Sequence, residues 1–235
     1  MRAVILTCAK PGTQPLVDLC RESVRKFAPN LYHAVFWHEG THADGIEGWR
    51  RRMLKFADPW DIVILLDSDV VVTSPHWASR LLDPFKNTVL QLAGAPKHSG
   101  PVEQVLYRQS TILHASCLAM RRELFEQMDF RPKGRLLDTA AMASLLTSTA
   151  KIFRFHPIGE GHLFPGLDVG EFFDPDDPAQ LTLWSHLMHG TNLWGRAGCW
   201  QRIKALMSLR AKTVLRRRQM RDAWMKRAWE LLRTA

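Results

Sequence analysis

The sequence predicts an α/β fold with a mostly parallel central sheet and helices on both faces, followed by C-terminal basic amphipathic helices. Three observations indicate this fold. The run Ile62–Leu66 is apolar and rich in β-branched residues, as in a strand that is buried on both faces. Two strand–helix units precede this run, and residues 201–235 contain no glycine or proline. We therefore expect a catalytic domain of residues 1–200 and a helical tail of residues 201–235.

The N-terminal elements have clear patterns. Residues 2–7 form an apolar run with β-branched side chains, which is typical of a strand. Apolar residues recur at helical spacing in residues 15–27. Residues 31–37 read as a second strand, and a polar loop leads to a helix at residues 48–57, which Asp58-Pro59 ends.

The remaining elements follow from the same periodicities and from glycine, proline and aspartate at the breaks. After the strand at residues 62–66, further strands are expected at residues 88–93, 110–120, 151–156 and 182–189. Further helices are expected at residues 74–82, 121–128 and 138–146. A stretch rich in glycine, proline and aspartate, residues 159–177, is expected to be a long functional loop.

The net charge of +9 is confined to the tail. Residues 201–235 hold 11 of the 32 lysines and arginines but only 2 of the 23 acidic residues, so residues 1–200 are neutral. The high pI therefore does not indicate a basic active site. The neutral body, without an aromatic stacking platform or a known binding motif, also makes nucleic acid an unfavoured partner.

The cysteines indicate a reducing compartment, and the hydropathy of the sequence indicates a protein without a membrane span. The four cysteines (Cys8, Cys20, Cys117 and Cys199) are widely spaced and form no zinc-binding pattern. The first strand is too short for a signal peptide, and no stretch has the 18 or so apolar residues of a membrane span. We expect free thiols and a cytoplasmic protein.

Asp67-Ser68-Asp69 is the most informative motif, because it places two carboxylates where a buried strand ends. Ligands of α/β sheets bind at the carboxyl ends of the strands. Carboxylates are costly to bury without partners, so the pair indicates a divalent cation and, through it, a phosphorylated substrate. The simpler reading of D-x-D is a solvated turn or a helix cap.

Residues 51–69, which end in this motif, resemble the nucleotide-sugar site of GT-A-fold glycosyltransferases of the glycogenin and bacterial galactosyltransferase type. The resemblance implies that the two aspartates hold Mn²⁺ or Mg²⁺, which bridges the diphosphate of a UDP-sugar donor, and that Arg51 contacts phosphate. The second family signature, a histidine followed by glycine and tryptophan, is similar to residues 184–194. It offers His186 or His189 as the further metal ligand. The usual Lys-Pro of that signature is Asn-Leu here.

The resemblance also implies contacts with the donor. Thr7, Cys8 and Ala9 follow the first strand and would line the base and ribose pocket. Asp67 and Ser68 would contact the nucleotide sugar, with Asp67 reaching the metal directly, reaching it through water, or binding the ribose.

Asp138 opens a helix and is similar in position to the acidic residue that faces the reacting sugar. In an inverting reaction it would be the base for the acceptor hydroxyl, and in a retaining reaction it would position the sugar. The alternative role is a helix N-cap.

Two other functions fit parts of the pattern. A phosphatase of the haloacid dehalogenase type would use Asp67 as nucleophile and Asp69 as acid/base, but such enzymes carry the motif near the N-terminus. A GT-A-like domain could also have lost activity and serve as a binding module.

The basic tail can be interpreted in two ways. Amphipathic basic helices bind anionic membrane surfaces, which would place a cytoplasmic enzyme at the inner face of the membrane, near a lipid-linked acceptor. Carbohydrate and protein acceptors remain open as well. Alternatively, the tail packs on the catalytic domain and leaves its arginines in solvent.

Overall fold

The computed structural model describes most of the chain of 235 residues. The described residues are 1–40, 42–53, 60–87, 89–96, 113–128, 150–156, 162–165, 167, 169–187 and 209–235.

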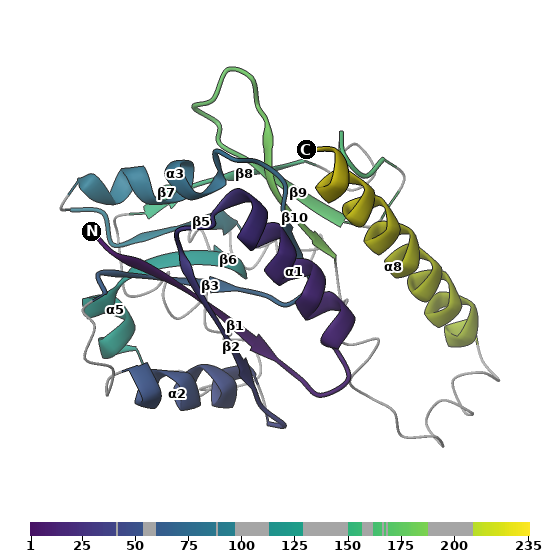
Figure 1. Ribbon diagram of the computed structural model, residues 1–235, viewed down its shortest axis with the longest axis horizontal. Helices are drawn as coiled ribbons and strands as arrows, with labels where there is room; N and C mark the ends of the chain where they lie inside the picture. The colour runs from purple at the N-terminus through teal and green to yellow at the C-terminus, as the bar shows by residue number, and fades with distance from the viewer. Residues whose placement is uncertain are drawn as a thin grey trace.

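A mixed sheet forms the centre of the molecule (Figure 1). Its strand order is β2 (Tyr32–Trp37), β1 (Ala3–Ala9), β3 (Ile62–Leu66), β6 (Leu113–Arg121), β5 (Leu92–Pro96) and β7 (Ala150–Ile152). All these strands run in one direction except β6, which is antiparallel to both of its neighbours. The expected α/β fold with a mostly parallel central sheet is therefore confirmed.

A second, antiparallel sheet lies beside the first. Its strand order is β4 (Val70–Val72), β10 (Thr182–Leu187), β9 (Val169–Phe173) and β8 (Arg154–His156). The chain enters the second sheet twice, from β3 to β4 through the acidic motif and from β7 to β8 at Phe153, and it returns to the central sheet between β4 and β5. The Phe153 side chain is buried and packs edge-on against Trp184 of β10, with ring centroids 5.3 Å apart.

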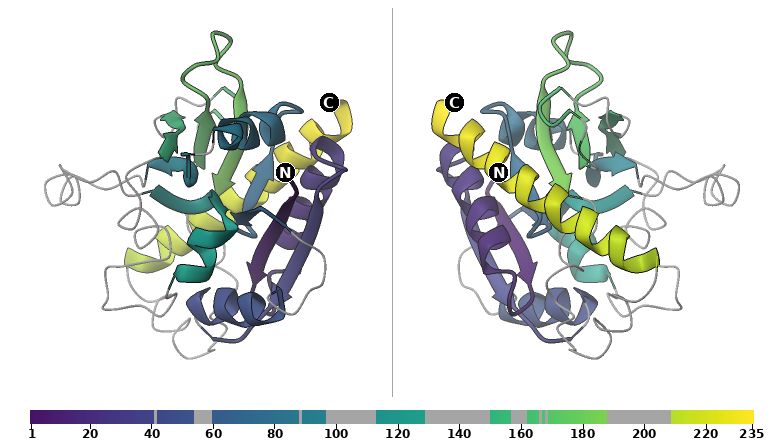
Figure 2. Two further views of the ribbon diagram at one scale, coloured as in Figure 1. Left: turned by 90° about the vertical axis from the view of Figure 1, so that its left-hand side faces the viewer. Right: turned by 90° about the vertical axis from the view of Figure 1, so that its right-hand side faces the viewer.

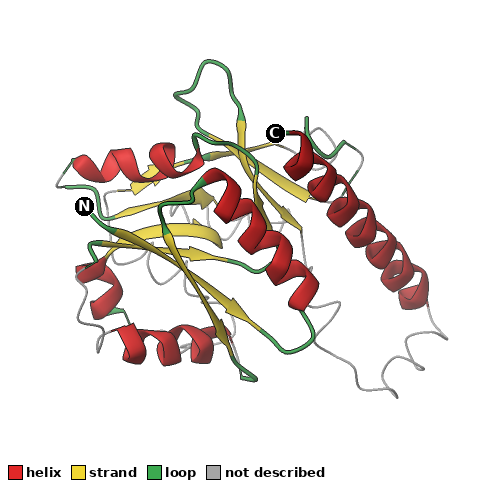
Figure 3. Ribbon diagram, viewed as in Figure 1, coloured by secondary structure: helices red, strands yellow, loops and turns green. Residues whose placement is uncertain are grey.

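Helices cover both faces of the central sheet (Figure 3). They are α1 (Gln14–Phe27), α2 (His42–Met53), α3 (Trp77–Leu82), which a 3₁₀ turn at Asp83–Lys86 extends, and α5 (Arg122–Gln127). Alternate residues of β3 explain this arrangement: Ile62 and Ile64 face a core that α1 and α3 share, and Val63 and Leu65 face the core of α2 and α5. The apolar run in the sequence is thus buried on both faces, as expected.

The C-terminal helix α8 (Leu209–Thr234) lies beside α1 (Figures 1 and 2). Trp224, Ala228 and Leu232 form its buried stripe at a spacing of four residues. They join a third core with side chains of α1, β4, β9 and β10. In its described part the tail therefore packs on the body, and its apolar stripe is covered by the protein. Within the described residues, every helix is too short or too polar to cross a bilayer.

Two expectations for the C-terminal half were wrong. The strand expected at residues 151–156 is two strands in different sheets, because the chain turns into the core at Phe153. The expected loop at residues 159–177 contains strand β9, whose residues are all buried. Its central residue, Glu171, is satisfied inside the protein: the carboxylate accepts hydrogen bonds from the backbone N–H groups of Leu163 and Phe164 and from the Thr182 hydroxyl.

A polar pair joins the edge strand β2 of the central sheet to its neighbour β1. Nε2 of His33 on β2 lies 2.8 Å from Oγ1 of Thr7 on β1. Burial lowers the pKa of His33 to about 4, and the nearby Arg21 charge adds to the effect. The imidazole is therefore neutral in the folded protein at neutral pH.

This pair predicts a pH dependence of stability. The pKa of His33 in the folded protein lies below the ordinary value of 6.5, so protonation favours the unfolded chain. The stability that the neutral imidazole contributes is complete above about pH 6.5 and should fall by about 1 to 3 kcal/mol as the pH drops from there to about 4. Urea unfolding of the wild type and His33→Gln across this range measures the difference. Parallel stability curves for the two proteins would contradict the prediction.

Candidate metal centre

The acidic motif forms the turn that joins the two sheets. The Asp67 N–H donates to the Ser116 carbonyl at 2.9 Å and so continues the pairing of β3 with β6. The Asp67 carbonyl accepts from the Val70 N–H at 3.2 Å and closes a reverse turn. The Asp69 carbonyl then accepts from the Leu187 N–H at 3.0 Å, next to the pairing of β4 with β10. Asp67 thus belongs to one sheet and Asp69 to the other.

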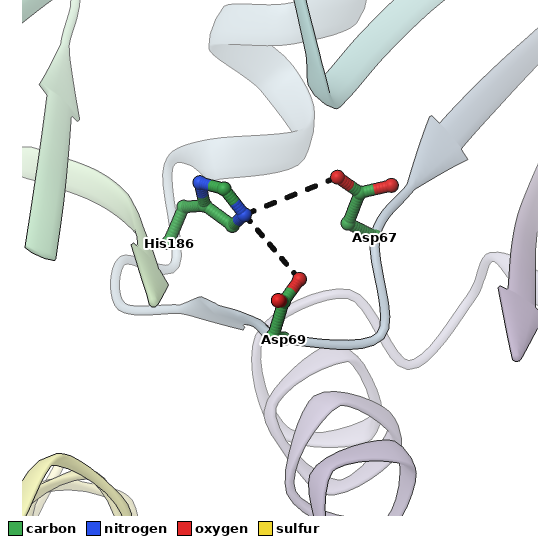
Figure 4. A group of neighbouring side chains, drawn as sticks. All are labelled: Asp67, Asp69 and His186. Carbon is green, nitrogen blue, oxygen red and sulfur yellow. Dashed lines mark ion pairs between the residues drawn. The ribbon is translucent and has the colours of Figure 1, made fainter. Parts of the chain in front are cut away.

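His186 faces the two carboxylates from β10 (Figure 4). Its Nε2 lies 3.3 Å from Oδ1 of Asp69 and 3.9 Å from Oδ2 of Asp67. One ligand atom from each of the three residues lies within 4.8 Å of the others. The turn places the aspartates, and the register of β10 against β4, in which His186 pairs with Val70, brings the imidazole to them.

At this cluster, burial and the neighbouring carboxylates shift the pKa of His186 in opposite directions. Asp69 and His186 are buried, with 3% and 5% of their surface exposed, and Asp67 is half-buried. Burial lowers the pKa of His186, but the carboxylates of Asp69 and Asp67 outweigh it, so the pKa is raised overall. The carboxylates therefore favour a positive charge at the point where the three side chains meet.

Three buried thiols lie around the motif. Cys20 on α1 directs its Sγ toward the Asp67 carbonyl at 3.7 Å, and Cys8 and Cys117 lie on β1 and β6. Burial raises the pKa of each thiol, and the charge of Asp67 adds to the rise. They are thus uncharged, and they surround the site with weakly polar groups. Cys8, Cys20 and Cys117 are free, as expected, and Cys199 lies outside the described residues.

Thr7, Cys8 and Ala9 end β1 at the same sheet edge as Asp67, because β1 and β3 pair in parallel. All three are buried, and the Thr7 hydroxyl is engaged with His33. Ser68 is buried as well, and its Oγ has no hydrogen-bond partner among the described residues. The nucleotide contacts of these residues stay a prediction.

Arg51 lies on the exposed surface of α2 with 76% of its side chain accessible. Its guanidinium donates to Glu47 one helical turn away. The neighbouring Arg50 also pairs with Glu47, and it donates to the Glu126 carbonyl, so it ties α2 to the end of α5. Phosphate contact by Arg51 remains a prediction that requires the pair with Glu47 to open.

Two of the expected site residues, Asp138 and His189, lie outside the described residues. Of the two competing histidines, the structure therefore places only His186, and it places it beside both aspartates. The sequence did not indicate that Ser185, next to His186, accepts a hydrogen bond from Trp224 of the C-terminal helix. The expected strand did place Ser185 on the opposite face from His186, because successive side chains of a strand point to opposite faces. No sequence pattern near Trp224 indicated that it contacts Ser185.

No protein-family model and no curated protein sequence matches the chain. Several solved structures are similar to it at low sequence identity. A mannosyltransferase from Pyrobaculum calidifontis, in complex with GDP-Man and Mn²⁺, has a TM-score of 0.48 and 12% identity over 64% of this chain and 54% of that chain. This chain thus spans about half the length of that protein.

Two further solved structures are similar to the chain, with comparable TM-scores and sequence identities. Glucosyl-3-phosphoglycerate synthase from Mycobacterium tuberculosis, in complex with Mn²⁺, uridine diphosphate and phosphoglyceric acid, has a TM-score of 0.46 and 16% identity over 64% of this chain and 68% of that chain. The galactosyltransferase LgtC, in complex with donor and acceptor sugar analogs, has a TM-score of 0.42 and 13% identity over 63% of this chain and 72% of that chain.

Proposed function

We propose that this protein is a metal-dependent glycosyltransferase, which transfers a sugar from a nucleotide-diphosphate sugar, a UDP-sugar, to a carbohydrate, lipid-linked or protein acceptor. The observation that carries the proposal is the meeting of Asp67, Asp69 and His186 at the carboxyl end of a central strand. The resemblance of residues 51–69 to a nucleotide-sugar site supports it. We place the protein in the cytoplasm.

The donor set fits a hard or borderline divalent cation. Two carboxylates and one imidazole, with atoms within 4.8 Å of one another, offer the oxygen-rich coordination that Mn²⁺ or Mg²⁺ favours. A bound cation would act as a Lewis acid on the diphosphate and neutralise the charge that develops on the leaving group. Asp69 and His186 would hold it, and Asp67, the most exposed of the three, would reach it or the ribose. His189 remains an alternative ligand.

The other residues have supporting roles. Ser68 would offer its buried hydroxyl to the donor, and the carboxyl end of β1, at Thr7, Cys8 and Ala9, would border the nucleotide. Asp138 would take the proton of the acceptor hydroxyl or position the sugar, according to the stereochemistry of the reaction.

Metal binding is the first test. Asp69→Asn and His186→Gln should each weaken Mn²⁺ binding in calorimetric titration by roughly 100-fold or more, since loss of an outer partner alone typically costs 10- to 100-fold. Asp61→Asn is the matched control, because Asp61 precedes the same strand at its opposite end and is half exposed. Wild-type affinity in either of the first two variants would rule out this set of ligands.

A donor screen tests the reaction. Hydrolysis of UDP- and GDP-sugars with Mn²⁺ or Mg²⁺ should show turnover that requires the metal and that Asp69→Asn abolishes, because the leaving diphosphate needs the cation. UDP-sugars should be the better donors. Hydrolysis of a phosphomonoester that depends on Asp67, without any reaction on nucleotide sugars, would replace the proposal with the phosphatase alternative.

We also propose that α8 brings the protein to an anionic membrane surface by charge. The apolar stripe of the helix is buried against the body, so insertion into the acyl region is disfavoured. Arg218, Lys226 and Arg233 are exposed on its outer side, where Asp222 and Glu230 reduce the net charge. Such a contact is electrostatic and weakens as salt screens it.

Vesicle co-sedimentation tests this contact. The protein should pellet with vesicles that contain phosphatidylserine at low salt, remain in solution with neutral vesicles, and be released as the salt rises. The triple variant Arg218→Glu, Lys226→Glu and Arg233→Glu should lose binding. A second triple variant with the same charge change at exposed Arg2, Lys10 and Lys86 should keep it. Equal pelleting of both variants would refute a specific role for α8.

A further inference from the structure

We infer that the C-terminal helix positions the metal ligand His186, and that it does so through the hydrogen bond between Trp224 and Ser185. The inference rests on the proposed function, since it concerns the same metal centre. Trp224 is a positioning residue in this view: it touches neither the cation nor the donor.

The two faces of strand β10 contact different parts of the protein: one faces the acidic motif and the other faces helix α8. His186 pairs with Val70 and projects toward the acidic motif, and the preceding residue, Ser185, pairs with Val71. Successive side chains of a strand point to opposite faces, so Ser185 and Val71 face away from the carboxylates. The outer face of the β4 and β10 pair is therefore the back of the metal centre.

Helix α8 covers this back face. Trp224 is wholly buried, and its Nε1 donates a hydrogen bond to Oγ of Ser185 at 3.2 Å. Its ring lies 6.1 Å from that of Phe164, measured between centroids, and belongs to the core that also contains Val71 and Leu187. The bond thus joins the helix to the residue adjacent to the candidate ligand.

Two further hydrogen bonds hold the helix in its place. Nζ of Lys26 on α1 donates to the carbonyl of Leu232 in the last turn of α8. The Arg227 guanidinium donates to the carbonyl of Leu163, whose N–H in turn donates to Glu171 on β9. Together with the Trp224 bond, these contacts tie α8 to α1 and to two strands of the second sheet.

The candidate site is sensitive to this support. Asp67 is placed by the central sheet through Ser116, whereas His186 belongs to the second sheet. The two therefore meet only if the second sheet keeps its position, and metal binding requires ligand atoms to be held within about half an ångström. The distance of 3.3 Å between His186 and Asp69 is kept by the β4 and β10 pairing on one side and by the α8 packing behind it.

Mn²⁺ titration of Trp224→Phe, Ser185→Ala and the double variant tests the inference. Each single variant should raise the Mn²⁺ dissociation constant about 10-fold, at the lower end of what partners outside the ligand set contribute. The double variant should lose no more than the larger single loss, because both changes remove the same hydrogen bond. Additive losses, or wild-type affinity in both single variants, would overturn the inference.

Trp229→Phe is the matched control. Trp229 lies on the same helix and is partly buried in the same core. Thermal unfolding should show that Trp229→Phe and Trp224→Phe both lower stability, while only Trp224→Phe weakens Mn²⁺ binding. Equal weakening at equal loss of stability would show that α8 stabilises the fold without positioning the ligand.

A measurement on the metal-free protein separates this inference from the proposed function. The NMR resonances of the His186 imidazole should shift in Trp224→Phe and Ser185→Ala and stay unchanged in Trp229→Phe. If the wild type fails to bind Mn²⁺ while these shifts occur, the metal proposal fails and the positioning role stands. Unchanged His186 resonances in the first two variants would overturn the positioning role whether or not Mn²⁺ binds.

Discussion

The candidate site depends on one reverse turn, from Asp67 to Val70, which carries the chain from the central sheet into the second sheet. Each end of the turn is fixed by a backbone hydrogen bond to a different sheet, through Ser116 on β6 and Leu187 on β10. The turn therefore sets the relation of the two sheets, and it carries both carboxylates. A residue placed there is held by two sheets at once, which suits side chains that must converge on one atom.

This dependence explains which parts of the structure the sequence could predict. The first strands, the helix at residues 15–27 and the acidic motif are local patterns, and all are present. The boundary between β7 and β8 could not be predicted from local sequence. It lies at Phe153, which turns inward because it packs on Trp184, a residue distant in the sequence. Strand β9 was hidden by its glycine and by Glu171, whose burial is favourable only once residues 163 and 164 donate to it.

The site shows the same division between local and long-range information. Asp67 and Asp69 could be identified from the strand before them, whereas His186 and His189 could not be separated by the sequence. The register of β10 against β4 brings His186 to the carboxylates, and that register comes from pairing across more than a hundred residues. The tail is similar: its periodicity indicated a helix, but whether the apolar stripe faces lipid or protein depends on α1, β4 and β10.

A cation at the turn would also act on the fold itself. Asp67 and Asp69 belong to different sheets, so a cation that both contact is a link between the sheets as well as a ligand for phosphate. A ligand that binds only the folded state stabilises it by mass action. The link would add to the packing of α8, which holds the same junction from behind through Trp224. Metal binding and helix packing should therefore be coupled, because both restrict the position of β10 relative to the acidic turn.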